Sequence, residues 1–205
     1  MDFALLSTVN PALVPADALI IAMTIQGLTP TGLALDEASA GQLSAALKAA
    51  NFEAKLGQTV SLYRVNNISC PVIVVVGAGD SKEFNGRALQ KVAAQAYKTL
   101  NSKMQAAYSF LSELTVTDRA AAQVISDIAR STLEVDYRFN QFKSKKNEAN
   151  NITMTLVVGE ELANATGQAA LSWGQAVATG QNFARDLGNL PPNVCHPSYL
   201  AEQAT

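Results

Sequence analysis

The side chains best suited to metal binding or acid–base chemistry are Cys195 and His196, which are adjacent near the end of the sequence. His196 is the only histidine in 205 residues, and Cys70 is the only other cysteine. A zinc site usually takes three or four His, Cys or carboxylate ligands at characteristic spacings. The isolated Cys-His pair therefore predicts a structural or incidental role. His196 keeps the chemistry of a general base, but the sequence offers no clear triad around it.

Two pairs of adjacent carboxylates are the next candidates for acid–base catalysis. Asp36-Glu37 falls at a predicted helix start and Glu160-Glu161 in a predicted loop. Carboxylates at these places stabilise helix N-termini or are simply solvated. Capping and solvation are therefore favoured over catalysis for both pairs.

Glycines at 77 and 79 follow an apolar run and precede a helical pattern. Such glycines let backbone amides approach a phosphate at the start of a helix. The third glycine of the dinucleotide-binding motif is absent, because Lys82 stands in its place. An ordinary strand-to-helix turn is the favoured interpretation, and no nucleotide site is predicted.

Charge is unevenly distributed along the chain. Residues 81–146 carry 11 Lys and Arg against 6 Asp and Glu, whereas both flanking segments are acidic. Arg138, Lys143, Lys145 and Lys146 concentrate the excess at one edge of this basic region. A solvated face is one interpretation, and a surface that contacts nucleic-acid phosphates is the other.

Composition bounds the class of protein. The chain is 48% hydrophobic with a net charge of −2 and a pI near 5.4, which excludes a disordered chain and a generally basic nucleic-acid binder. Two distant cysteines predict free thiols in a reducing compartment. No apolar run approaches the roughly 18 to 20 residues that span a bilayer, and the N-terminus lacks the basic region of a signal peptide. These features predict a cytoplasmic protein without a membrane partner.

The elements that must position these residues alternate between strands and helices. Apolar or alternating runs predict strands at 3–6, 18–23, 59–65, 71–76, 106–111 and 152–158, with 59–65 and 71–76 forming a hairpin. Helical spacing predicts helices at 36–50, at 84–100, after a capping Asp118, through Leu133, Tyr137 and Phe139, and from Thr166 to about Leu187. Helices between buried strands imply a three-layer α/β/α sandwich with a mixed sheet.

The long helix carries an apolar stripe that includes Trp173, Val177 and Phe183, which predicts packing in the core or against another domain. After Gly188 the chain is extended and proline-containing, and residues 198–202 predict the beginning of another helix. We therefore expect a fragment that ends shortly after a domain boundary.

Residues 182–204, NFARDLGNLPPNVCHPSYLAEQA, resemble the signature that joins the two domains of leucyl (cytosol) aminopeptidases, closest to the proteobacterial type. The matching positions are Ala184-Arg185-Asp186-Leu187, Asn189, Pro192-Asn193 and Tyr199-Leu200-Ala201. Residues 74–96 are similar to the family's strand, turn and following helix. The resemblance implies a macro-domain-like N-terminal domain at 1–165, a connecting helix at 166–188, and a linker at 189–205 that begins the catalytic domain. Asn189, Pro192 and Asn193 would be interdomain linker residues.

Members of that family use two divalent ions, Mn or Zn, to remove N-terminal residues, preferentially Leu, from peptides. Their metal ligands belong to the C-terminal domain, so the resemblance implies no catalytic or metal residue in this chain, which would be inactive alone. The implied partners are its own catalytic domain and a homo-hexamer. The alternative is a DNA-binding regulatory module that uses Arg138, Lys143, Lys145 and Lys146, because some bacterial relatives also bind DNA. Macro domains elsewhere bind ADP-ribose, but no residue pattern here supports that transfer.

Overall fold

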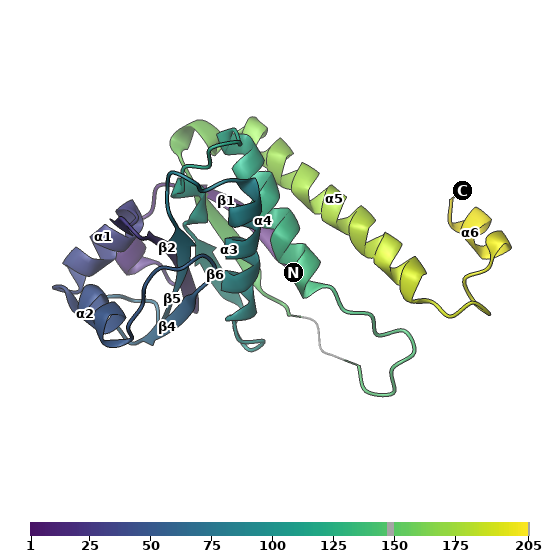
Figure 1. Cartoon of the computed structure of the whole chain (residues 1–205), viewed down its shortest axis with the longest axis horizontal. Helices are drawn as coiled ribbons and strands as arrows, with labels where there is room; N and C mark the ends of the chain where they lie inside the picture. The colour runs from purple at the N-terminus through teal and green to yellow at the C-terminus, as the bar shows by residue number, and fades with distance from the viewer. Residues whose placement is uncertain (147–149, 205) are drawn as a thin grey trace.

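A mixed sheet with helices on both faces forms the fold, in agreement with the predicted sandwich (Figure 1). The computed structural model describes residues 1–146 and 150–204. Within them the strand order is β1-β7-β6-β2-β5-β4, with β3 paired to β2. The strands are β1 (Asp2–Ser7), β2 (Ala18–Thr24), β3 (Gly27–Leu28), β4 (Thr59–Tyr63), β5 (Val72–Gly79), β6 (Ala106–Ser109) and β7 (Thr153–Val158). Along this order each neighbouring pair is parallel from β1 through β7, β6 and β2 to β5. The last strand, β4, runs antiparallel to β5, which confirms the predicted hairpin.

The helices fall into two layers and one outlying element. On one face of the sheet lie α1 (Pro30–Ala38) and α2 (Gln42–Ala49). On the other face lie α3 (Gly86–Lys98), α4 (Ala121–Asp136) and α5 (Ala165–Asn189), and α6 (Pro197–Gln203) stands apart from both layers. Short 3-10 turns are η1 (Pro11–Leu13), η2 (Leu111–Glu113) and η3 (Glu160–Leu162). None of the helices in residues 1–146 and 150–204 combines the length and apolarity that a bilayer crossing requires.

Burial on both faces explains the continuous apolar runs of the central strands. Successive side chains of a strand point to opposite faces. Along β2, Ile20 and Ala22 join the core beneath α3 and α4, whereas Leu19 and Ile21 join the core beneath α1 and α2. A strand covered in this way has no polar face, so its sequence reads ALIIA without alternation.

The helices predicted at 36–50 and after Asp118 differ from the structure. The helix predicted at 36–50 is broken into α1 and α2 by Gly41, whose φ of +82° is left-handed. The helix after Asp118 begins only at Ala121, and Asp118 instead accepts a hydrogen bond from the Gly86 amide of α3 at 2.7 Å.

Gly77 lies within β5 and not in a strand-to-helix turn. A Cβ on this residue would collide with the backbone of Ala54 and Lys55, which crosses beside the strand. The glycine is therefore required by a close approach of two backbone segments, which is one of the established uses of a glycine in a strand.

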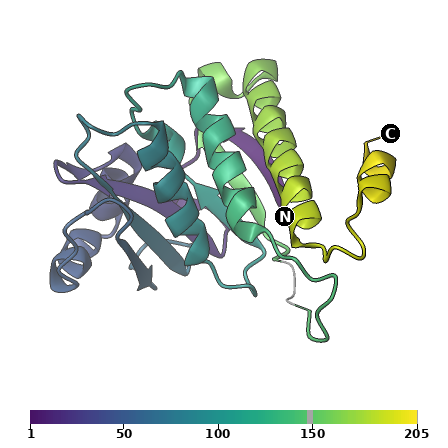
Figure 2. The same ribbon diagram turned by 45° about the vertical axis from the view of Figure 1, so that its right-hand side comes forward.

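The contact between α4 and α5 is the largest helix–helix interface of the sandwich, and the two helices lie side by side in both views (Figure 1, Figure 2). The buried positions of α5 are Gly167, Leu171, Gly174 and Ala178. A Cβ at Gly174 would collide with the backbone of Ser126 on α4. The absence of a side chain at 174 thus permits the two helix backbones to approach closely.

We expect Gly174→Ala to lower the free energy of unfolding by about 1–3 kcal/mol, because the added methyl group must push α5 away from α4. Gly180 lies on the exposed side of the same helix, where a Cβ would meet nothing within 4 Å. Gly180→Ala should therefore raise the free energy of unfolding by about 0.5–1 kcal/mol through helix propensity alone. Urea denaturation of both variants measures this difference, and stabilisation by both substitutions would contradict the close approach.

Candidate functional site at the end of the long helix

The signature residues between Arg185 and Asn189 lie on the last turns of α5, beside the end of α4. The Tyr137 hydroxyl donates to Asp186 Oδ1 at 2.8 Å and accepts from Asn189 Nδ2 at 3.0 Å. The Arg185 guanidinium lies over the Tyr137 ring, 5.3 Å from its centroid, and donates to the Glu134 carbonyl at 2.8 Å. We call these four side chains, together with the Glu134 carbonyl, the helix-end cluster.

The helix-end cluster joins the ends of two helices, so it fixes the direction in which the chain leaves the sandwich. Partial burial and the hydrogen bond to Asp186 raise the pKa of Tyr137 above its ordinary value of 10.0. The hydroxyl therefore stays protonated and remains a donor to Asp186 well above neutral pH. Arg185 adds a cation–π contact on the ring face, an interaction that contributes about 0.5–1 kcal/mol at exposed sites.

Tyr137 is the residue of this cluster that sequence reasoning missed. The helical spacing of Leu133, Tyr137 and Phe139 predicted a helix through all three, but α4 ends at Asp136 and Tyr137 has extended backbone angles, φ −55° and ψ 132°. Leaving the helix lets its ring meet α5. Tyr137 and Asp186 are 49 positions apart, so no local pattern could have paired them.

The predicted linker residues have different surroundings. Asn189 belongs to the helix-end cluster, whereas Pro192 and Asn193 are exposed. The amides of Val194 and Cys195 both donate to the Pro191 carbonyl at 2.9 Å, which folds this segment into a turn. The segment that connects α5 to α6 therefore begins at the buried Leu190 and holds its turn by its own backbone hydrogen bonds.

His196 caps α6, because its Nδ1 accepts the Tyr199 amide at 3.3 Å. The structural role predicted for the Cys-His pair is thus confirmed for the histidine, and both Cys195 and Cys70 are free thiols. Across residues 1–146 and 150–204, no three His, Cys, Asp or Glu side chains lie close enough together to hold a metal ion.

The other carboxylates that sequence reasoning singled out have structural surroundings. Asp36 accepts from the Ser44 amide at 2.8 Å and from its hydroxyl at 2.6 Å, which fastens the start of α2 to α1. Glu160 and Glu161 are exposed in η3, ahead of α5. The solvated interpretation agrees for Glu160 and Glu161, but the helix start predicted at Asp36-Glu37 is wrong, because both residues lie in the last turn of α1.

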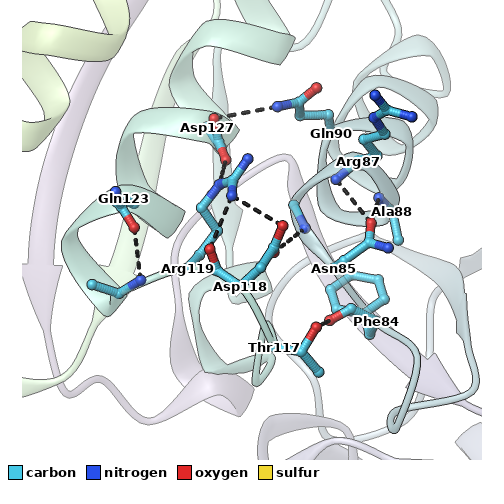
Figure 3. A network of polar contacts seen from close by, with 12 residues as sticks. Phe84, Asn85, Arg87, Ala88, Gln90, Thr117, Asp118, Arg119, Gln123 and Asp127 are labelled. Carbon is cyan, nitrogen blue, oxygen red and sulfur yellow. Dashed lines mark hydrogen bonds and ion pairs between the residues drawn. The ribbon is translucent and has the colours of Figure 1, made fainter.

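A network of charged side chains sets α4 against α3 (Figure 3). Arg119 donates to Asp127 at 2.8 Å and to Asp118 at 3.1 Å, and Asp118 holds the first amide of α3, that of Gly86. A Cβ on Gly86 would lie 2.6 Å from the Arg119 guanidinium, so this glycine makes room for the arginine. Asn85 caps the start of α3, because its Oδ1 accepts hydrogen bonds from the amides of Arg87 and Ala88. The network positions the helix on which α5 rests.

The apolar stripe predicted on α5 is largely exposed. Trp173 is 68% exposed and Phe183 is 44% exposed, whereas Leu171 and Ala178 on the opposite side are buried. Core packing is therefore the wrong interpretation for Trp173 and Phe183. Contact with another domain remains a prediction for these side chains.

The predicted basic set divides into one paired and three exposed side chains. Arg138 forms an ion pair with Asp136 at 3.1 Å and also donates to the Asp136 carbonyl at 2.6 Å. Lys143, Lys145 and Lys146 lie exposed on the segment that follows α4. Arg138 is therefore held at the sandwich, while the lysines are accessible.

We expect Tyr137→Phe to lower the free energy of unfolding by about 1 kcal/mol, since it removes both hydrogen bonds of the hydroxyl. The residues after Asn189 should then be cleaved faster by added protease, because the end of α5 loses an anchor. Urea denaturation and mass spectrometry of the fragments measure the two effects. Tyr63→Phe is the matched control, because Tyr63 is 70% exposed, and an equal response of the two variants would contradict this role.

The sequence model described as the N-terminal domain of the cytosol aminopeptidase family matches residues 21–146. A probable cytosol aminopeptidase of Dechloromonas aromatica is 40% identical over 173 residues, which is 83% of this chain and 35% of the relative. That of Azotobacter vinelandii is 37% identical over 179 residues, and that of Pseudomonas aeruginosa is 32% identical over 206 residues, 100% of this chain and 41% of the relative. The chain thus spans little more than a third of the length of these relatives.

Solved structures share the fold. A tomato leucine aminopeptidase mutant matches 100% of this chain and 41% of its own, with a TM-score of 0.79 at 22% identity. The bottromycin maturation enzyme BotP matches 92% of this chain and 36% of its own, with a TM-score of 0.69 at 18% identity. BotP in complex with Mn gives a TM-score of 0.68 at 19% identity. With residues 21–146 matching the family's N-terminal domain, this chain belongs to the cytosol aminopeptidase family.

Proposed function

We propose that this chain is the non-catalytic N-terminal domain of a dinuclear-metal leucyl aminopeptidase. The observation that carries the proposal is the match of residues 21–146 to the family's N-terminal domain. In this proposal the parent enzyme removes N-terminal residues, preferentially Leu, from peptides, and works in the cytoplasm as a homo-hexamer. The proposed bounds are 1–165 for the sandwich, 166–188 for the connecting helix and 189–205 for the interdomain linker, and α5 extends one residue beyond the proposed helix at each end.

The two Mn or Zn ions of the proposed reaction would be held by residues outside this chain. No three potential ligands gather within the described residues, so the side chains present do not fit a dinuclear site. Hydrolysis is therefore assigned to the catalytic domain, and the proposed role of this chain is to help assembly and access to the active site.

The surface offered to the catalytic domain is the exposed side of α5 together with α6. Trp173 and Phe183 expose large apolar side chains on α5, and no residue of the seven-residue α6 is buried. Isolated helices this short are marginal in water, so α6 gains from a partner that covers it. The helix-end cluster would give the two domains a defined relative orientation.

The pure 205-residue chain should not hydrolyse leucine p-nitroanilide, with or without added Mn²⁺ or Zn²⁺, because it has no group of metal ligands among its described residues. A chimera in which this chain replaces the matching part of the Dechloromonas aromatica relative should hydrolyse it, and EDTA should abolish that activity. Absorbance of the released nitroaniline measures both. Metal-dependent turnover by the pure chain would overturn the proposal, and so would a folded chimera that is inactive.

A second candidate function, DNA binding, is favoured by the exposure of Lys143, Lys145 and Lys146 on one segment. This segment extends away from the sandwich below α4 (Figure 1). Three adjacent cations on a projecting segment can reach phosphates that the sandwich itself does not touch. Arg138 contributes less in this proposal than the sequence suggested, because Asp136 neutralises it.

If this segment binds DNA, Lys143→Glu, Lys145→Glu and Lys146→Glu combined should abolish binding to duplex DNA at low salt. The log of the parent's binding constant should fall with the log of salt concentration by about 0.9 per phosphate neutralised. The control variant combines Lys48→Glu, Lys82→Glu and Lys103→Glu, which change the net charge by the same amount at other exposed lysines. It should bind duplex DNA more tightly than the first variant. Fluorescence anisotropy measures the binding. Unchanged affinity in the first variant, or none in the parent, would leave the segment as a solvated face.

A further inference from the structure

The outer face of α5 is apolar although it is exposed. The sequence has no charged residue from 162 to 184, which is most of the helix. Trp173 and Phe183 are 68% and 44% exposed on this face, and α5 is the outermost helix of its layer (Figure 2). A helix at the surface of a soluble protein usually turns charged and polar residues outwards. The composition of α5 is therefore typical of a helix that is covered on both sides.

A row of small residues runs along this face at every fourth position. Each member of the row is exposed, and the members are Ser172, Ala176, Gly180, Ala184 and Gly188. Residues four apart lie one above the other on a helix, so the row forms one shallow line with Trp173 on one side of it and Phe183 on the other. In helix packing, the i±4n row of one helix fits between such rows of another. This small-residue row therefore matches a second helix.

The other glycines of α5 show what a missing side chain does in this helix. A Cβ at Gly167 would collide with the Leu162 carbonyl, and a Cβ at Gly174 would collide with the backbone of Ser126. A Cβ at Gly180 would meet nothing within 4 Å among the described residues. Glycine in the middle of a helix lowers its stability, and Gly180 has this cost without a close backbone contact. A further backbone segment that approaches Gly180 accounts for the glycine.

The rest of the parent protein lies within reach of the small-residue row. This chain corresponds to 35% of the Dechloromonas aromatica relative and 41% of the Pseudomonas aeruginosa relative, so most of such a protein lies outside it. Residues 190–196, between α5 and α6, can span at most about 25 Å, whereas the 25 residues of α5 extend over about 37 Å. In the proposed function the catalytic domain continues from α6, so its first residues stay close to α5.

Charge and tethering favour the catalytic domain over other occupants of this face. An uncharged face does not attract nucleic-acid phosphates or an anionic membrane surface. A domain joined through a short linker acts at an effective concentration of the order of millimolar. A second copy of this chain would have to compete with it at the much lower concentration of the free protein.

We propose that a helix of the catalytic domain packs across the small-residue row of α5 and makes its closest approach at Gly180, between Trp173 and Phe183. This docking rests on the proposed function and adds to it the kind of element that covers α5 and the position at which the two helices cross.

Thiol labelling of Ala176→Cys tests the contact, because a maleimide reacts with a cysteine only where it is accessible. In the 205-residue chain the new thiol should react at a rate similar to that of Lys48→Cys, an exposed position of α2 on the other face of the sheet. In the chimera with the Dechloromonas aromatica relative, labelling at 176 should slow at least about tenfold and labelling at 48 less than about twofold. Mass spectrometry of labelled peptides separates these thiols from Cys70 and Cys195.

Activity of the chimera separates this docking from the proposed function. Unchanged labelling at 176 in a chimera that hydrolyses leucine p-nitroanilide would overturn the docking and leave the proposed function standing. A folded but inactive chimera contradicts the proposed function, whereas slow labelling at 176 in it would still support the contact. Slow labelling in the 205-residue chain alone, with a dimer in sedimentation analysis, would make a second copy the occupant and overturn the docking. If the chimera does not fold, the same exchange in the Azotobacter vinelandii relative takes its place.

A bulky side chain on the small-residue row gives an independent result. Gly180→Leu should separate the two helices in the chimera and speed the labelling of Ala176→Cys at least about fivefold. In the 205-residue chain the same substitution should not lower the unfolding temperature, since a Cβ at 180 meets nothing there and leucine favours a helix. Thr179→Leu adds similar bulk at an exposed position about 100° around the helix and should leave the labelling slow. Equal effects of the two substitutions on labelling would overturn the proposal.

Discussion

The contact of α5 with α4 is the constraint on which the position of the family signature depends. A 25-residue helix reaches well beyond the sheet that supports it, so its direction is set by the residues that bury one side of it. Gly174 brings its backbone against α4, and Leu171 and Ala178 flank this contact. The helix-end cluster then adds a second point of attachment. Two attachment points along one helix axis define a direction, and a single point would not.

Each layer of the sandwich positions the next. Both cores lock the sheet between helices, Asp118 and Arg119 join α4 to the start of α3, and α4 carries α5. This arrangement suits a domain whose proposed task is to hold another domain.

The sequence by itself determined the elements and the class of the protein. Apolar runs are long enough at 18–23, 71–76 and 152–158 to identify buried strands, because strands covered on both faces need no polar alternation. The long helix was predicted from its spacing within two residues at each end, although the helix runs through Gly188 and Asn189, which were predicted as its stop signal. The family also followed from local residues, because the signature is contiguous from 182 to 204.

Only the tertiary structure decided what each face meets. Helical spacing shows that Trp173 lies on an apolar stripe, but not whether another layer covers it, and in this chain none of the described layers does. The pairing of Tyr137 with Asp186 depends on segments far apart in sequence. Gly77 is required by a crossing segment of backbone and not by a turn of its own. Local periodicity encodes which side of an element is apolar; the order in which strands assemble decides which distant residues become neighbours.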